Sequence, residues 1–154
     1  MFHVILHCPE IPPNTGTVIR LCANTGCTLH LVRPLGFTLD DKQLQRAGMD
    51  YAEVAEVRVY DSLDDCLRKL AAGRLFAIET GAATNYAQVR FQPGDALLFG
   101  SESKGLPAQV LAGIPAERIL SIPMRPGNRS LNLANSVALV AYEAWRQQQF
   151  ALLP

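Results

Sequence analysis

Short apolar runs alternate along the chain with segments in which apolar residues recur at helical spacing. The runs are bounded by Gly, Pro, Asn and Asp, and this pattern predicts buried or half-buried strands. The predicted strands are Phe2–Cys8, Leu29–Pro34, Glu56–Asp61, Leu75–Thr80, Ala96–Gly100 and Arg118–Pro123.

The segments between these strands predict helices. The first runs from Thr15 to about Thr25, with Asn14 near its cap, because Asn accepts hydrogen bonds from free first-turn amides. The longest is Leu131–Gln149, with Ser130 or Asn132 as the cap. The remaining predicted helices are Asp40–Ala47, Ser62–Ala72 and a short helix that begins at Pro107.

This alternation predicts an α/β fold, with a Rossmann-like, largely parallel sheet flanked by helices. Ligands in such sheets bind beyond the carboxyl ends of the strands. The loops expected there follow Cys8, Thr80, Gly100 and Pro123. The 154 residues contain no linker or internal repeat, so we expect one domain over residues 1–154.

Composition is typical of a soluble globular protein, with 49% hydrophobic and 18% charged residues. Basic and acidic residues number 14 each, so a nucleic-acid partner would require a local basic patch. The start MFHVILHC lacks the features of a signal peptide, and no apolar run is long enough for a membrane helix. We therefore expect a cytoplasmic protein with no membrane partner.

The cysteines and histidines do not match a known metal-binding motif. Cys22, Cys27 and His30 are the one combination that suggests zinc, but they lack a CxxC pair, so we expect no metal. His3 and His7 share one face of the first strand and are assigned structural roles, whereas His30 has no evident partner. No Ser/His/Asp arrangement supports a hydrolase.

Two segments near strand ends carry candidate chemistry. In NTGTVIR, Gly16 and Arg20 are four residues apart and share a helix face, although this segment taken alone favours a capped helix with a surface arginine. In LLFGSESKGLP, a buried strand leads into a polar turn that carries Glu102 and Lys104 before Gly105. Its lysine precedes the second glycine, so it is no P-loop, and no GxGxxG occurs anywhere. An ordinary strand-to-helix turn remains the alternative.

The third segment extends from Ile122 to Arg146. A loop with Arg125 and Arg129 leads into a helix rich in small residues, which permits another backbone to approach closely. Polar groups at the start of this helix are suited to an anion or a ligand, although a capped core helix is the simpler alternative. By contrast, the stretch ETGAATNYAQ after Ile78 carries no distinctive motif.

In this order and at these separations, the three segments resemble the three motifs of the SPOUT methyltransferase superfamily. The motifs are NTGTVIR, FGSESKGLP, and IPM followed by RSLNLANSVALVAYEAWR, and the resemblance covers essentially the whole chain. Within the superfamily, EIPPNTG, RLCANTG and YEAWRQ are most similar to the minimal, single-domain bacterial tRNA wobble-ribose 2′-O-methyltransferases.

The resemblance implies a fold, a cofactor and partners. The fold would contain a deep trefoil knot near the C-terminus, an exception to the rule that chains do not thread loops. S-adenosyl-L-methionine would be the methyl donor, S-adenosyl-L-homocysteine the product, and no metal would be needed. The enzyme would be a homodimer with its active site at the subunit interface. It would methylate the wobble cytidine or modified uridine in the anticodon loop of leucine tRNAs.

The resemblance also implies site residues. The catalytic pair would be Arg20 and Asn14. The cofactor would contact Ile78, Gly100, Glu102, Gly105, Ile122, Met124, Ser130 and Leu131. The RNA would contact Arg125, Arg129, Tyr142 and Arg146, with Lys104 as a further cation.

Methyl transfer to a ribose hydroxyl requires alignment, exclusion of water and removal of the hydroxyl proton. Because a guanidinium stays protonated in proteins, we expect Arg20 to hold the adjacent phosphate and to lower the pKa of the hydroxyl electrostatically. Three alternatives remain open at this point. They are a ribosomal or other tRNA nucleotide as substrate, a non-catalytic RNA-binding scaffold, and a flavodoxin-like nucleotide binder.

Overall fold

The computed structural model describes residues 1–39, 57–70 and 73–151. Seven strands form one sheet in the order β3-β2-β1-β6-β4-β7-β5, and every paired strand is parallel to its neighbour. The strands are β1 (His3–His7), β2 (Thr28–Val32), β3 (Val57–Tyr60), β4 (Leu75–Ile78), β5 (Thr84–Asn85), β6 (Ala96–Phe99) and β7 (Ile119–Ser121). The predicted parallel α/β fold is confirmed. The two-residue β5, which was not predicted from the sequence, pairs with β7 at the sheet edge.

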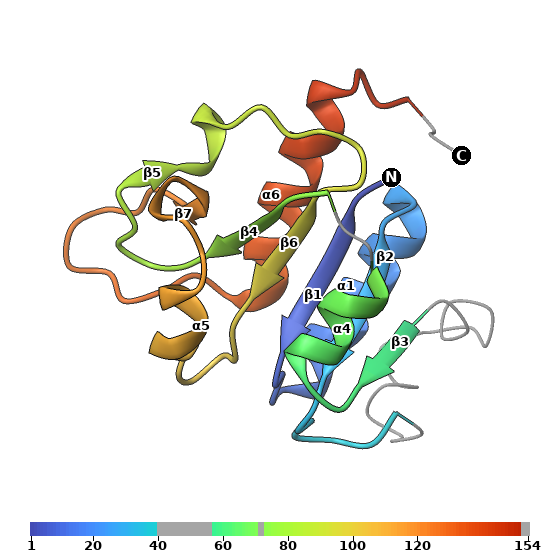
Figure 1. Ribbon diagram of the computed structural model, residues 1–154. Coiled ribbons are helices and arrows are strands. Elements are labelled where there is room, and N and C mark those ends of the chain that lie inside the picture. The colour runs from blue at the N-terminus through green and yellow to red at the C-terminus, as the bar shows by residue number, and fades with distance from the viewer. Residues whose placement is uncertain (40–56, 71–72, 152–154) are drawn as a thin grey trace.

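Helices cover both faces of the sheet, so the molecule has three layers (Figure 1). On one face, α1 (Pro12–Thr25) packs against α6 (Leu133–Gln147), and on the other lie α4 (Leu63–Leu70) and α5 (Ala108–Ala112). Two short 3-10 helices, Tyr86–Gln88 and Ala116–Arg118, precede β6 and β7. The predicted helix Asp40–Ala47 lies outside the described residues. Among the helices that the structure describes, none is long and apolar enough to cross a bilayer.

Two hydrophobic clusters form the core, one on each face of the sheet. The larger one joins the sheet to α1 and α6 through residues such as Phe2, Val18 and Val137. The smaller one joins it to α4 and α5, around Ile5 and Leu98. This division follows from the alternation of side chains along each strand, because successive residues point to opposite faces.

The start of α1 differs from the expectation. The helix begins at Pro12 rather than Thr15, and Ile11, not Asn14, is its N-cap, with no side-chain cap bond. Proline suits a first helical turn because its ring fixes φ and because its missing N–H has no partner there in any case. Asn14 therefore lies inside the first turn. At α6, in contrast, Asn132 is the cap and accepts a hydrogen bond from the amide of Asn135 at 3.2 Å.

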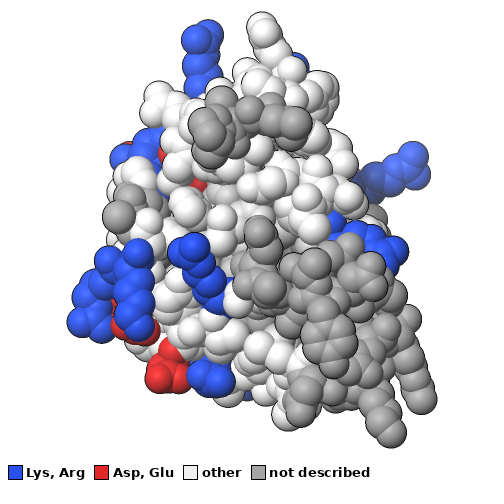
Figure 2. Space-filling view, turned by 90° about the vertical axis from the view of Figure 1, so that its right-hand side faces the viewer, with Lys and Arg blue, Asp and Glu red and all other residues white. Residues whose placement is uncertain are grey.

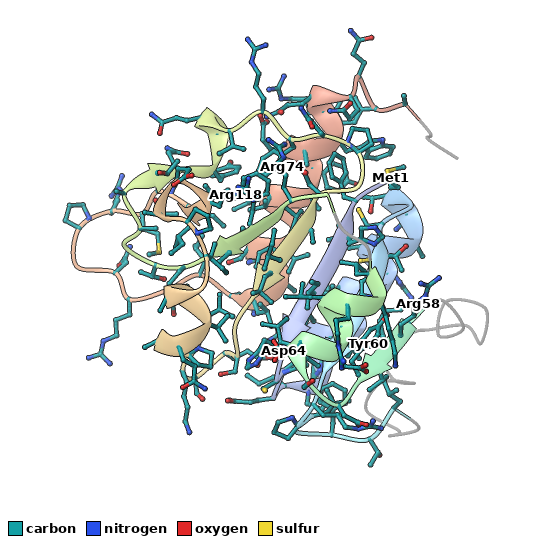
Figure 3. All side chains as sticks on the ribbon, viewed as in Figure 1. Met1, Arg58, Tyr60, Asp64, Arg74 and Arg118 are labelled. Atoms are coloured by element: carbon teal, nitrogen blue, oxygen red, sulfur yellow. The ribbon has the colours of Figure 1, made fainter. Side chains whose placement is uncertain are left out.

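A buried histidine connects three strands on the α4 side of the sheet. His30 has no exposed surface; its Nε2 lies 3.2 Å from Nδ1 of His3 and its Nδ1 lies 3.1 Å from the hydroxyl of Tyr60. Tyr60 is the last residue of β3, and Nζ of Lys69, on α4, lies 5.8 Å from the centroid of its ring (Figure 3). His30 therefore has two partners that its sequence neighbourhood did not reveal. Burial lowers the pKa of His30 to about 4, and the charges of His3 and Arg58 add to this effect.

This burial predicts a loss of stability in mild acid. The unfolded chain binds a proton at His30 near pH 6.5 and the folded chain only near pH 4, so stability is full above pH 6.5 and falls as the pH drops toward 4. Between pH 7 and pH 5 the free energy of unfolding should fall by about 2 kcal/mol through this group. Urea unfolding at both pH values measures the fall. His30→Gln should remove most of it, and an unchanged pH dependence in that variant would contradict the assignment.

Candidate active site

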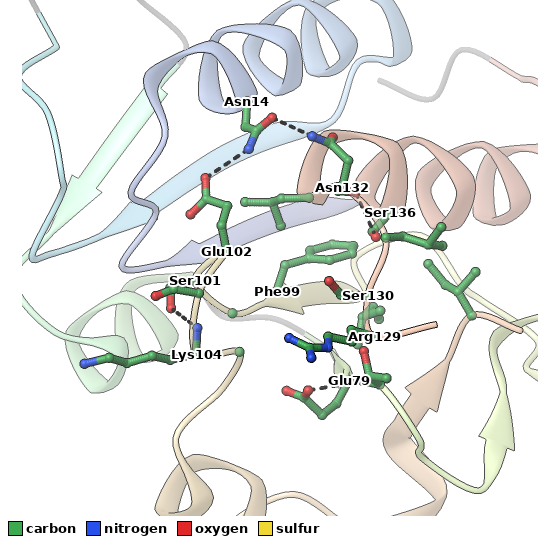
Figure 4. Close-up of a pocket in the computed structure, with 18 of the residues that line it drawn as sticks. Asn14, Glu79, Phe99, Ser101, Glu102, Lys104, Arg129, Ser130, Asn132 and Ser136 are labelled. Atoms are coloured by element: carbon green, nitrogen blue, oxygen red, sulfur yellow. Dashed lines mark hydrogen bonds between the residues drawn. The ribbon is translucent and has the colours of Figure 1, made fainter. Parts of the chain in front are cut away.

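One cavity of about 550 Å³ opens at the carboxyl ends of β4, β6 and β7, next to the first turns of α1 and α6. Its volume falls within the range of small-molecule sites in proteins. The lining combines apolar side chains with serines, amides and four charged groups (Figure 4). The lining residues are Ile11, Asn14, 78–80, 99–105, Ile122, Met124, 129–133 and Ser136.

The loop after β6 is folded tightly enough to require glycine at both ends. Ser101 and Gly105 form an antiparallel bridge, with the amide of Gly105 2.9 Å from the carbonyl oxygen of Ser101. A methyl group on Gly100 would lie 2.5 Å from the carbonyl oxygen of Gly105 and closer still to its carbonyl carbon. Gly105 has a φ of +66°, a conformation that glycine adopts without steric cost. The turn therefore presents backbone, not side chain, to the cavity at Gly100.

A chain of hydrogen bonds links the three segments singled out in the sequence. Glu102 accepts hydrogen bonds from the amides of Glu10 and Ile11, at 2.8 and 3.0 Å, and from the side chain of Asn14 at 3.3 Å. The other end of the Asn14 amide accepts a hydrogen bond from Asn132 at 2.9 Å. Both ends of the Asn14 side chain are thus engaged, and Glu102 joins the loop after β6 to the residues before α1 and to its first turn.

Glu79 fixes the far side of the same loop. Directly after β4, its carboxylate accepts hydrogen bonds from the amides of Thr80 and Leu106, at 3.1 and 3.0 Å. The two loops at the carboxyl ends of β4 and β6 are therefore held together at the floor of the cavity. Glu79 was not predicted from the sequence, because its segment has no motif. One signal in the sequence pointed to this residue. Glu79 is an acidic residue directly after a buried strand, and the strand Ala96–Gly100 ends in glycine.

A family model described as the SpoU rRNA Methylase family matches residues 1–142. The chain belongs to this family.

Curated relatives of this SpoU-family chain carry the name tRNA (cytidine(34)-2′-O)-methyltransferase. A protein of this name from Burkholderia ambifaria is 56% identical over 152 residues, with 97% of each chain covered. Another from Methylovorus glucosotrophus is 52% identical over 151 residues, with 98% of each covered. A solved structure described as giving insights into the 2-OH methylation of C/U34 on tRNA superimposes with a TM-score of 0.89. It is 46% identical, with 98% of each chain covered.

In this SpoU-family chain, all eight residues assigned to the cofactor line this cavity. Two of them are also structural: Glu102 anchors α1, and Gly105 makes room for Glu79. Among the residues assigned to RNA, Arg129 lines the cavity, whereas Arg125 is exposed in the loop before it. Tyr142 and Arg146 lie one turn apart on the exposed side of α6, and Arg146 pairs with Glu143 at 2.8 Å.

Arg20 does not line the cavity of its own chain. It is exposed on α1, six residues beyond Asn14 and therefore more than one helical turn away. The two residues assigned to catalysis are thus separated within one chain. The wall of the cavity within one chain is therefore formed without Arg20.

The zinc alternative is not supported by the positions of its three residues. Cys22 and Cys27 are buried in the cluster beneath α1 and α6, where burial raises the pKa of both thiols. His30 instead bonds to Tyr60, which belongs to the cluster on the other face of the sheet.

Proposed function

We propose that this chain is an S-adenosyl-L-methionine-dependent enzyme that methylates the 2′-hydroxyl of the wobble nucleotide in tRNA. The cytidine or modified uridine at position 34 of leucine tRNAs would be its substrate. The observation that carries the proposal is the meeting of all three motif segments at one cavity. The names of relatives more than 50% identical over nearly the whole chain support the reaction and the nucleotide. The leucine tRNAs are proposed from the resemblance of the motif segments.

The cavity fits this cofactor in size and in the chemistry of its walls. An apolar wall suited to an adenine ring is formed by Ile78, Phe99, Ile122, Met124 and Leu131. Backbone at Gly100 and the hydroxyls of Ser101 and Ser130 offer hydrogen bonds to polar groups of a nucleoside. S-adenosyl-L-methionine supplies an activated methyl group when bound. The residues of the protein then need only hold, orient and shield the reacting groups.

Arg20 would act on the ribose from the partner subunit. Its guanidinium would hold the phosphate next to the wobble ribose and stabilise the oxygen as its proton leaves. Asn14, held by Glu102 and Asn132, would act by positioning the first turn of α1 against the cavity. The proposed homodimer is supported by the absence of Arg20 from the lining of its own cavity and by exposed apolar residues such as Leu139 and Tyr142 on α6.

The remaining parts of the proposal concern the fold and the setting. We also propose that residues 1–154 form a single domain, that the protein is cytoplasmic, and that its fold contains a deep trefoil knot. The path of the chain supports the knot: β7 lies beside β4, yet α6 then returns across the sheet to pack on β6 and α1. These three features follow the resemblance of the whole chain to the SPOUT enzymes.

The decisive experiment is transfer of labelled methyl groups to total RNA, followed by nucleoside mapping. Label in the 2′-O-methylated nucleotide at position 34 of leucine tRNAs is the expected result. Because the family description names rRNA, ribosomal RNA belongs in the same experiment as the alternative substrate. Label confined to rRNA or to another tRNA position would overturn the substrate, and no transfer to any RNA would favour a binding scaffold.

RNA binding should depend steeply on salt. Some basic side chains lie next to acidic ones on the face shown in Figure 2. Two of the described ion pairs are Arg33–Asp61 and Lys69–Asp65. We expect phosphate contacts from Arg20, Lys104, Arg125 and Arg129. Four such contacts predict that the Kd for tRNA rises about 50-fold between 50 and 200 mM salt. Filter binding measures this, and a salt-independent Kd would contradict the phosphate contacts.

A further inference from the structure

Glu79 is an acidic side chain in the cavity wall with no basic partner among the described residues. None of the described ion pairs includes it. Its carboxylate is half-buried at the end of β4 and faces the cavity beside the loop after β6 (Figure 4). A negative charge held there acts on any ligand that the cavity binds.

The position of this charge is fixed by the backbone. One carboxylate oxygen accepts a hydrogen bond from the amide of Thr80, and the other accepts one from the amide of Leu106. A side chain on Gly105 would meet both oxygens at 3.0 Å, so glycine leaves the space that the carboxylate occupies. Two amide dipoles stabilise the charge without cancelling it, because neither donor carries a net charge.

The other charged groups of the cavity are placed differently. Glu102 accepts three hydrogen bonds from the start of α1, to which its carboxylate is directed. Lys104 and Arg129 are exposed, so water and salt screen their charges. Glu79 is therefore the cavity acid whose carboxylate is bonded to the loops after β4 and β6 and not to the start of α1.

We propose that Glu79 makes the cavity discriminate between the methyl donor and the spent product by charge. The inference rests on the proposed function. The donor carries a sulfonium, whereas the product is a thioether that lacks this positive charge. A fixed carboxylate in the same half-enclosed cavity attracts the first more strongly than the second. Binding of the product is thereby weakened relative to the donor, which favours exchange of product for donor after each turnover.

The test is the ratio of two dissociation constants, measured by calorimetry on the full-length protein. The ligands are S-adenosyl-L-homocysteine and S-adenosyl-L-methionine, each titrated without tRNA and with tRNA whose wobble ribose is already 2′-O-methylated, so that no transfer occurs during the measurement. In Glu79→Gln the product-to-donor Kd ratio should fall about fivefold to tenfold relative to the unmodified protein. Glu79→Asp, which keeps the charge but shortens the side chain, should hold the ratio within about twofold. Glu117→Gln removes an exposed carboxylate outside the cavity and should leave the ratio unchanged.

The ratio separates the charge from a merely structural role. If Glu79 only supported the loop, Glu79→Gln would weaken both ligands equally and the ratio would stay constant, which would overturn the inference while leaving the proposed function intact. A ratio that falls equally in Glu79→Asp would also overturn it, because the charge is present there. If the unmodified protein bound neither ligand, with or without tRNA, the proposed function and the inference would both fail.

Discussion

Replacing Arg20 with alanine is expected to lower the rate of methyl transfer about 100- to 1,000-fold while leaving the fold and the cofactor affinity unchanged. Loss of a group that stabilises charge in a transition state has effects of this size. The side chain is exposed on α1 and does not line the cavity, so its removal should disturb neither the core nor the cofactor site. Single-turnover rates at saturating tRNA, together with calorimetry of S-adenosyl-L-homocysteine, measure both parts.

Arg20→Lys separates geometry from charge. Lysine keeps the positive charge but lacks the planar fork that pairs with two phosphate oxygens, so the rate should still fall about tenfold or more. Arg68→Ala is the matched control, because Arg68 is an exposed arginine on α4, on the opposite face of the sheet. A near-normal rate in Arg20→Lys would contradict the bidentate role.

The contribution of Arg20 across the subunit interface has its own test. Met124→Trp should fill the cavity, since Met124 lines it. A mixed dimer of this variant with Arg20→Ala would then contain one complete site, built from the cavity of one chain and the arginine of the other. An equal mixture should regain about a quarter of the normal activity, because half of randomly formed dimers are mixed and each has one of two sites. No recovery after verified exchange of subunits would place Arg20 and the cavity within the same chain.

Gly100→Ala is expected to destabilise the protein by about 3 kcal/mol and to weaken cofactor binding more than tenfold. The added methyl group would lie 2.5 Å from the carbonyl oxygen of Gly105, whose backbone is held by the bridge to Ser101. Overpacking of this kind costs about 1–3 kcal/mol, and the upper end applies where no flexible side chain can move aside. The loop that forms the cavity wall must shift instead.

Gly113→Ala is the control for this substitution. Gly113 ends α5 with a right-handed helical φ of −85°, and a methyl group there would meet its nearest neighbour at an ordinary 3.5 Å. Its stability should stay within about 0.5 kcal/mol of the unmodified protein. Urea unfolding and calorimetry with S-adenosyl-L-homocysteine measure both variants. If Gly100→Ala matched Gly113→Ala in both measurements, the close crossing at Gly100 would not matter for the site.

The succession of strands and helices was determined by the sequence itself. All six predicted strands are present within the described residues, with ends that differ from the prediction by at most two residues, because hydrophobic periodicity is a property of neighbouring residues. Because the strands are parallel, the loops that follow their carboxyl ends lie at the same edge of the sheet. For this reason the loops after β4, β6 and β7, which are far apart in the chain, could be assigned to one site from the amino-acid sequence alone.

The partners of individual polar groups were decided only by the tertiary structure. Asn14 was expected to cap α1, yet its side chain bonds to Glu102 and Asn132, which are 88 and 118 residues away. His30 had no evident partner until β1 and β3 brought His3 and Tyr60 beside it. The carboxylate of Glu79 is held by a hydrogen bond from the amide of Leu106, on a neighbouring loop. Hydrogen-bond partners depend on distance in space, which local periodicity does not encode.

The same distinction holds for the cavity. The sequence by itself determined the types of residue that its wall contains, because each motif is a short contiguous segment. The tertiary structure decided that Glu102 supports α1, that Glu79 bonds to the loop after β6, and that Arg20 lies outside the cavity of its own chain. The physical reason is that a side chain's role follows from the groups within a few ångströms of it, and folding alone brings those groups together.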